Sequence, residues 1–221
     1  MSKNTNPHTN KGPRARTKSK GLIIFSRIAS FVFHPFFMTT LAALTIYKLA
    51  PSSSHEHSSI GIFIAELALF TIVFPFISVL LFRKLGLISN TRMHEPKDRI
   101  YPLLTALVFY TLAYWFLVKG QPLFIHSLLL GSCLSIFILF TVTNFYKMSV
   151  HTTAASILPG ICILLVVNEK MTIAPLIFAS LVAIIVGMVR WLLGAHTVGQ
   201  ILLGYLTGIF TQIGAYYYLH L

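Results

Sequence analysis

The chain has 221 residues, of which 56% are hydrophobic and only 10% are charged, and its mean hydropathy is +0.79. Soluble domains carry about 25% charged residues, so this composition excludes an ordinary water-soluble globular protein. The net charge is nevertheless +12, from 17 Lys and Arg against 5 Asp and Glu. An apolar and basic chain of this length is typical of a single bundle of transmembrane helices.

Residues 1–20 form a polar tail with six Lys and Arg and no acid. Two prolines and a glycine oppose a helix here, so we expect a disordered tail that contacts anionic lipid headgroups. The apolar stretch 21–50 that follows is too long for a signal peptide. We expect an interfacial or tilted entry at 22–33 and a first span at 34–50.

The remaining chain alternates apolar segments with short polar connections, and each segment has about the 20 residues that cross a bilayer core. This pattern predicts an all-α, polytopic transmembrane helix bundle of six to seven spans. The organisation divides into the tail 1–20, N-terminal membrane helices 21–83 and a core 84–221. Pro75 predicts a kink, and Gly204 with Gly208 predicts close helix packing. The segments are 60–83, 102–118, 122–143, 150–167, 172–190 and 196–219.

Three polar clusters, 92–99, 147–151 and 190–196, follow the second, fourth and sixth spans. Because an even number of crossings separates them, all three must emerge on the same side of the membrane. Charges that are distant in sequence but converge on one face indicate a site rather than scattered loop charges.

The third cluster has the most specific spacing: Arg190, five residues, His196, three residues and Gln200. On a helix, His196 and Gln200 lie one turn apart on one face. Arg190 falls at a depth where an unpaired guanidinium is costly. Taken singly, an interfacial arginine and a polar residue at a helix start are equally good interpretations.

The other two clusters supply an anion-binding turn and further cations. Ser149 is a good helix N-cap, and the backbone N–H groups at such a helix start can bind an anion. His151 follows two residues later and can face the same pocket. Arg92, Lys97 and Arg99 form the first cluster. An ordinary positive cytoplasmic loop also accounts for them, and especially for Lys97.

Together these residues resemble the type 2 phosphatidic acid phosphatase family, integral membrane lipid phosphatases related to vanadium haloperoxidases. That family carries three motifs: K-x6-R-P, P-S-G-H and S-R-x5-H-x3-D. Residues 92–99 keep the first spacing with Arg for Lys, and Pro102 lies two residues late. Residues 148–151 keep Ser and His of the second motif, and residues 189–200 keep Arg and His of the third, with Val for Ser and Gln for Asp. The resemblance covers roughly residues 84–221.

The resemblance implies a haloperoxidase-like helical catalytic core that hydrolyses a lipid phosphate through a phosphohistidine. It makes His196 the nucleophile and His151 the general acid, with Gln200 orienting His196 in place of a charged Asp. Arginine clamps let phosphoryl transfer proceed without an obligatory metal, so we expect neither metal nor cofactor. The implied substrates are a polyprenyl diphosphate, phosphatidylglycerophosphate, phosphatidic acid or lipid A phosphates. The implied phosphate ligands are Arg92, Lys97, Arg99, Ser149 and Arg190.

Other interpretations stay open. A non-catalytic binder or carrier of phosphorylated lipid would use the same cations, and the neutral Gln200 is compatible with it. Aromatic residues do not interleave with the charges of the tail, so we expect membrane lipid and no nucleic acid as its partner. His34 and His126 lie at span ends without a supporting pattern and are interpreted as structural. Glu66 is either functional or hydrogen-bonded to another helix.

The distribution of loop charge predicts the orientation. The tail and all three clusters share one side, which the excess of Lys and Arg places in the cytoplasm, with the C-terminus outside. Members of the phosphatase family often act on the outer face, and only the tail is evidence independent of the site. We therefore expect an integral protein of a bacterial inner membrane with a cytoplasmic N-terminal tail.

Overall fold

The computed structural model describes residues 20–49, 57–88 and 97–221. Within these ranges the chain forms helices and no strand, and six helices are long and apolar enough to cross a membrane. The predicted all-α polytopic bundle is therefore confirmed. The helices are α1 (Lys20–Val32), α2 (Pro35–Leu49), α3 (His57–Ala68), the π-helical segment η1 (Leu69–Val73), α4 (Phe74–Lys84), α5 (Lys97–Leu117), α6 (Leu123–Val142), α7 (Val150–Val167), α8 (Ile173–Leu192) and α9 (Val198–His220).

Most helix boundaries lie within three residues of the prediction; α9 begins at Val198 rather than at the predicted residue 196, so His196 precedes it, and two larger differences concern α5 and α1. Helix α5 begins at Lys97, five residues before the predicted start, and Pro102 lies inside it. A proline in the second turn removes one backbone hydrogen bond without ending the helix. As a result Arg99 is held on a helix rather than in a loop. The stretch predicted as an entry forms a separate helix, α1, which packs against α8. Nearly all of the predicted tail, residues 1–19, lies outside the described residues.

The second span is continuous but changes its helical geometry before Pro75. Helix α3 passes into η1 and then into α4, and the backbone N–H of Phe74 donates to the carbonyl of Leu69. This i to i−5 bond widens the turn directly before the proline, which has no N–H for a helical bond. The irregularity predicted at Pro75 is therefore a π-helical turn.

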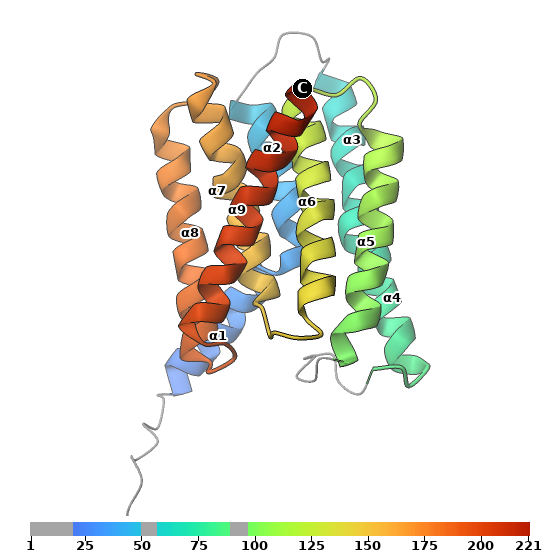
Figure 1. The fold of residues 1–221 in the computed structure, drawn as a ribbon, viewed down its shortest axis with the longest axis vertical. Helices are drawn as coiled ribbons and strands as arrows, with labels where there is room; N and C mark the ends of the chain where they lie inside the picture. The colour runs from blue at the N-terminus through green and yellow to red at the C-terminus, as the bar shows by residue number, and fades with distance from the viewer. Residues whose placement is uncertain (1–19, 50–56, 89–96) are drawn as a thin grey trace, which may run out of the picture.

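The spans run antiparallel, so their connections alternate between the two ends of the bundle (Figure 1). Helices α4, α6 and α8 end at the end of the bundle that also carries α1, and helices α5, α7 and α9 begin there. We call this end the site end. The C-terminus lies at the opposite end. The predicted convergence of the second and third polar clusters, and of Arg99 from the first, is confirmed.

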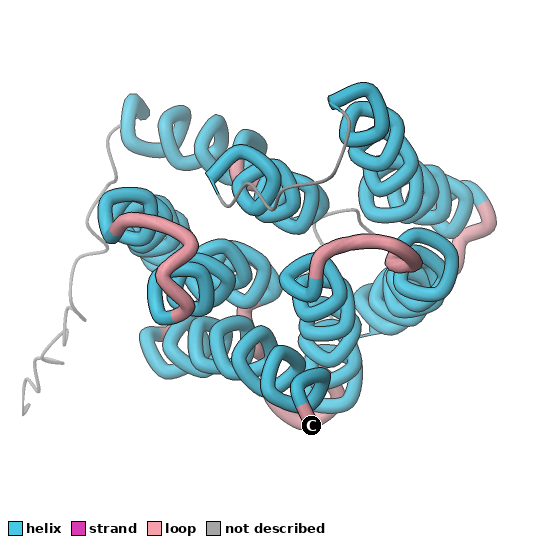
Figure 2. Tube along the Cα trace, turned by 90° about the horizontal axis from the view of Figure 1, so that it is seen from above, coloured by secondary structure: helices cyan, strands magenta, loops and turns pink. Residues whose placement is uncertain are grey.

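Helix α7 is the central helix of the bundle. Residues 152–162 are all buried, and α7 contacts α2, α6, α8 and α9. A view along the bundle shows only helices and short loops in the described chain (Figure 2). Small side chains such as Thr152, Ala155 and Ser156 allow these neighbours to approach closely.

Helices α7 and α9 approach each other closely. A Cβ atom added to Gly204 would lie 2.2 Å from Oγ1 of Thr152, so the predicted close packing at this glycine is present. The backbone N–H of Ser149 also donates to the carbonyl oxygen of Gln200 (3.3 Å). Oγ1 of Thr152 donates to the carbonyl of Ile201 (3.2 Å). These contacts hold the start of α7, which carries one predicted site histidine, against the start of α9.

Candidate active site

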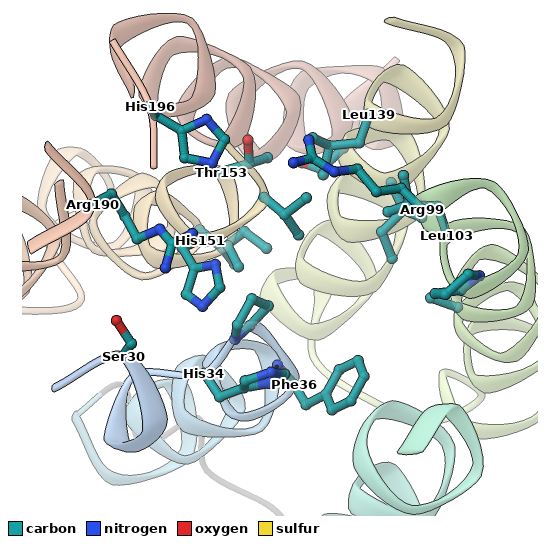
Figure 3. Close-up of a pocket in the computed structure, with 18 of the residues that line it drawn as sticks. Ser30, His34, Phe36, Arg99, Leu103, Leu139, His151, Thr153, Arg190 and His196 are labelled. Carbon is teal, nitrogen blue, oxygen red and sulfur yellow. Dashed lines mark hydrogen bonds between the residues drawn. The ribbon is translucent and has the colours of Figure 1, made fainter. Parts of the chain in front are cut away.

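A cavity of about 810 Å³ extends from the site end into the bundle. Its charged and imidazole side chains lie around one region (Figure 3). Tyr110 also lines it, eleven residues after Arg99 on α5, so the cavity reaches about 16 Å along that helix. The charged and imidazole lining residues are His34, Arg99, Lys147, His151, Arg190 and His196.

His196 lies in the α8–α9 connection and is only 8% exposed. Its Nδ1 atom is 3.2 Å from Oε1 of Gln200, which also accepts the backbone N–H of Thr197 (3.1 Å). Oγ1 of Thr197 in turn accepts the backbone N–H of Gln200, completing a capping box at the start of α9. Because Oε1 is an acceptor here, Nδ1 of His196 must be the donor. The lone pair of the neutral ring is therefore on Nε2.

The surroundings keep this ring neutral. Burial, together with the positive charges of Arg190, Arg99 and Lys147, lowers the pKa of His196 to about 4, although the hydrogen bond to Gln200 opposes the shift. The unprotonated ring is thus the main form at neutral pH. A buried, oriented imidazole with a free Nε2 is chemically competent as a nucleophile.

Two arginines face the cavity from different helices (Figure 3). Arg99 belongs to the first turn of α5 and is buried, and Arg190 belongs to the last turn of α8. Nε of Arg190 is buried without a hydrogen-bond partner among the described residues. An unsatisfied buried donor costs about 1–3 kcal/mol, more when charged, and a bound anion would remove that cost.

His151 lines the cavity in the first turn of α7, and a second histidine stands beside it. The rings of His151 and His34 are 5.7 Å apart between centroids and nearly perpendicular. The interpretation of His34 as structural is therefore incomplete, because the residue lines the same cavity. Its sequence signal is the His34-Pro35 break in an apolar run at the site end. His126, by contrast, lies against Tyr114 and outside this cavity.

Ser149 has a different place from the one expected for a phosphate ligand. It is the N-cap of α7, as predicted, and its hydroxyl accepts the backbone N–H of Thr152 (3.4 Å). It is fully buried and does not line the cavity, because capping turns Oγ toward its own helix. Thr153 lines the cavity instead.

The remaining predicted residues divide between described and undescribed segments. Arg92 lies outside the described residues, and Lys97 is the first residue of α5, at the site end. Lys147, immediately before the cap of α7, lines the cavity. Glu66 is exposed on α3 and away from the cavity lining. Sequence reasoning also gave no indication of Ser30, a lining residue from α1.

The charge of the lining is uniformly positive. In the described part of the chain, no Asp or Glu lines the cavity, and no three His, Cys, Asp or Glu side chains are grouped as a metal site. Two arginines, a lysine and donor-bearing imidazoles are the groups that bind phosphate oxygens. The arrangement is thus suited to an anion held directly by side chains.

Comparison with known proteins identifies no relative, because no family model matches the chain and no curated protein or solved structure is significantly similar to it.

Proposed function

We propose that the chain is a divergent type 2 phosphatidic acid phosphatase, an integral membrane enzyme that hydrolyses a lipid phosphate. The observation that carries this proposal is the placement of His196: a buried ring whose Nδ1 lies 3.2 Å from Oε1 of Gln200, which leaves the lone pair of the neutral ring on Nε2. This ring shares one cavity with Arg99, Arg190 and His151.

In the proposed reaction, Nε2 of His196 attacks phosphorus and forms a P–N bond while the bond to the leaving lipid oxygen breaks. His151 donates a proton to that oxygen, and the same residue then takes a proton from the water that hydrolyses the phosphohistidine. Arg99 and Arg190, with Lys147, hold the non-bridging oxygens as charge redistributes in the transition state. Hydrolysis releases inorganic phosphate and restores neutral His196.

The apolar part of the cavity lining favours a lipid over a small soluble substrate. Further from the site end than the charged residues, aliphatic side chains from α5, α6 and α7 line the cavity, together with the hydroxyls of Thr39, Tyr110 and Ser132. An apolar chain leaves water favourably for such a surface, at about 25 cal/mol for each Å² buried. These aliphatic residues include Leu103, Ala106, Ile136, Leu139 and Ile157.

Phosphate release from a panel of lipid phosphates in detergent tests this function. The parent should release phosphate, His196→Ala should lose release by a factor of about 10³ or more, and His126→Ala should retain it because that ring is remote from the cavity. Release that survives in His196→Ala at the parent rate would exclude this residue as the nucleophile.

A carrier of phosphorylated lipid is the second candidate, and the neutral Gln200 favours it. A carboxylate at this position would stabilise the positive His196 ring during attack, whereas the amide only orients the ring. A carrier would bind lipid phosphate with similar affinity in the parent and in His196→Ala, and neither would release phosphate. Gln200→Asp should retain or raise release if the chain is an enzyme.

A further inference from the structure

The N-terminal helix contributes an unsatisfied polar atom to the cavity. Oγ of Ser30, on α1, is buried without a hydrogen-bond partner among the described residues, and so is Nε of Arg190. Both residues line the cavity, and Figure 3 shows the Ser30 hydroxyl turned toward Arg190. Leaving two buried polar atoms unpaired is costly, so their placement on one wall indicates a site for a ligand.

His34 adds a third donor to this wall. Its Nδ1 accepts the backbone N–H of Phe36 (3.4 Å), so a neutral ring carries its proton on Nε2. His34 lies in the α1–α2 connection, where burial and then the charge of Arg190 lower its pKa. The ring is therefore a neutral hydrogen-bond donor next to His151.

We propose that Ser30, His34 and Nε of Arg190 form a second anion subsite that binds the additional phosphoryl group of a lipid diphosphate. This inference rests on the proposed function, in which His196 attacks the phosphate whose oxygens Arg99 and Arg190 hold; in a diphosphate, that phosphate is the terminal one. All three groups of the subsite are donors, so they fit phosphate oxygens better than a hydroxylated or cationic headgroup. The planar guanidinium of Arg190 presents separate donor edges, so one residue contacts both phosphates.

The subsite also defines the leaving group. Nε2 of His196 attacks the terminal phosphorus, the bond to the bridging oxygen breaks, and the electron pair stays on that oxygen. The lipid monophosphate leaves with the bridging oxygen, which takes its proton from His151, and its remaining oxygens are held by Ser30 and His34. Water then hydrolyses the phosphohistidine to inorganic phosphate. A lipid monophosphate undergoes the same attack without these additional contacts.

Binding of small anions tests the subsite without turnover. In full-length His196→Ala, calorimetry should show pyrophosphate binding about tenfold or more tightly than phosphate, as expected for hydrogen bonds to a charged group. Ser30→Ala and His34→Ala should reduce this preference below about threefold. Ser26→Ala is the matched control, because Ser26 is also a buried serine of α1 without a partner in the described chain but does not line the cavity. Equal affinity for the two anions, or a preference unchanged in both variants, would overturn the subsite.

Steady-state turnover provides a second test of the subsite. For a prenyl diphosphate and the monophosphate of the same chain length, Ser30→Ala should lower kcat/KM about tenfold for the diphosphate and less than about threefold for the monophosphate. An equal loss for both substrates would overturn the assignment. If the parent releases no phosphate from either lipid but still prefers pyrophosphate, the phosphatase proposal fails while the subsite stands.

Discussion

Replacing Gly208 by alanine tests the helix contact that positions the site. Gly208 of α9 faces α7 so closely that an added Cβ would lie 2.0 Å from Oγ of Ser156 and 2.3 Å from the backbone oxygen of Thr153. The serine side chain is able to rotate away, but the carbonyl belongs to the helix. Because ordinary contacts begin at 3.4 Å, the two helices must separate by roughly 1 Å.

Because the helices must separate, Gly208→Ala should lower the free energy of unfolding. Overpacking of a close contact costs about 1–3 kcal/mol. Alanine also gains about 0.8–1.0 kcal/mol over glycine within a helix, which offsets part of the loss. Gly214→Ala is the matched control, since a Cβ there meets no atom within 4 Å in the described chain. The propensity gain is common to both variants, so their difference isolates the contact, at about 1–3 kcal/mol.

Reversible unfolding in detergent, followed by circular dichroism, measures both variants against the parent. We expect Gly214→Ala to be at least as stable as the parent and Gly208→Ala to be less stable. Phosphate release should fall in Gly208→Ala as well, because Thr153 lines the cavity. Equal stability of the two variants would refute the close approach of α7 and α9.

Four further expectations follow from the site and from the opposite end of the bundle. The active ring of His196 is neutral above its pKa of about 4, so phosphate release should be lost as pH falls through about 4 rather than 6.5. Gln200→Glu should raise the pKa of His196, so release should be lost at a higher pH than in the parent. Loss of release at the same pH in both would argue against the His196–Gln200 bond. Tyr216→Phe removes the bond to Asn168 (2.8 Å) and should cost about 1 kcal/mol without changing release, and lost activity would contradict its remoteness. A reporter fused to the C-terminus should be active only outside the cell, and a cytoplasmic signal would reverse the orientation.

The fold was largely predictable because apolar length is a strong local signal. Spans such as 150–167 and 172–190 agree with α7 and α8 within two residues, since the bilayer fixes how long each apolar run must be. The convergence of the polar clusters followed from the parity of the crossings alone. The predicted segment began at residue 102 because the apolar run begins there, whereas the polar first turn of α5, from Lys97, carries no apolar signal; the structure places Pro102 in the second turn.

The site was predictable only in part. The i to i+4 spacing of His196 and Gln200 predicted their contact, but the structure places His196 before Thr197, the N-cap of α9. The contact therefore depends on the capping box, in which Oε1 of Gln200 turns back to the backbone N–H of Thr197. The position of His34 depends on how the α1–α2 connection packs on α7 and α8, which local sequence does not specify. Thr153 lines the cavity and Ser149 does not, because the Ser149 side chain caps α7; the sequence does not show which of the two side chains faces the cavity.

Direct capture of the covalent intermediate tests the central claim. The parent would be incubated with a lipid phosphate radiolabelled on its terminal phosphoryl group and then denatured in alkali. We expect label on the protein that is stable in alkali, released in acid and absent from His196→Ala, as a phosphoramidate at this ring requires. Phosphate release without any trapped label in the parent, or equal label in His196→Ala, would contradict nucleophilic attack by His196.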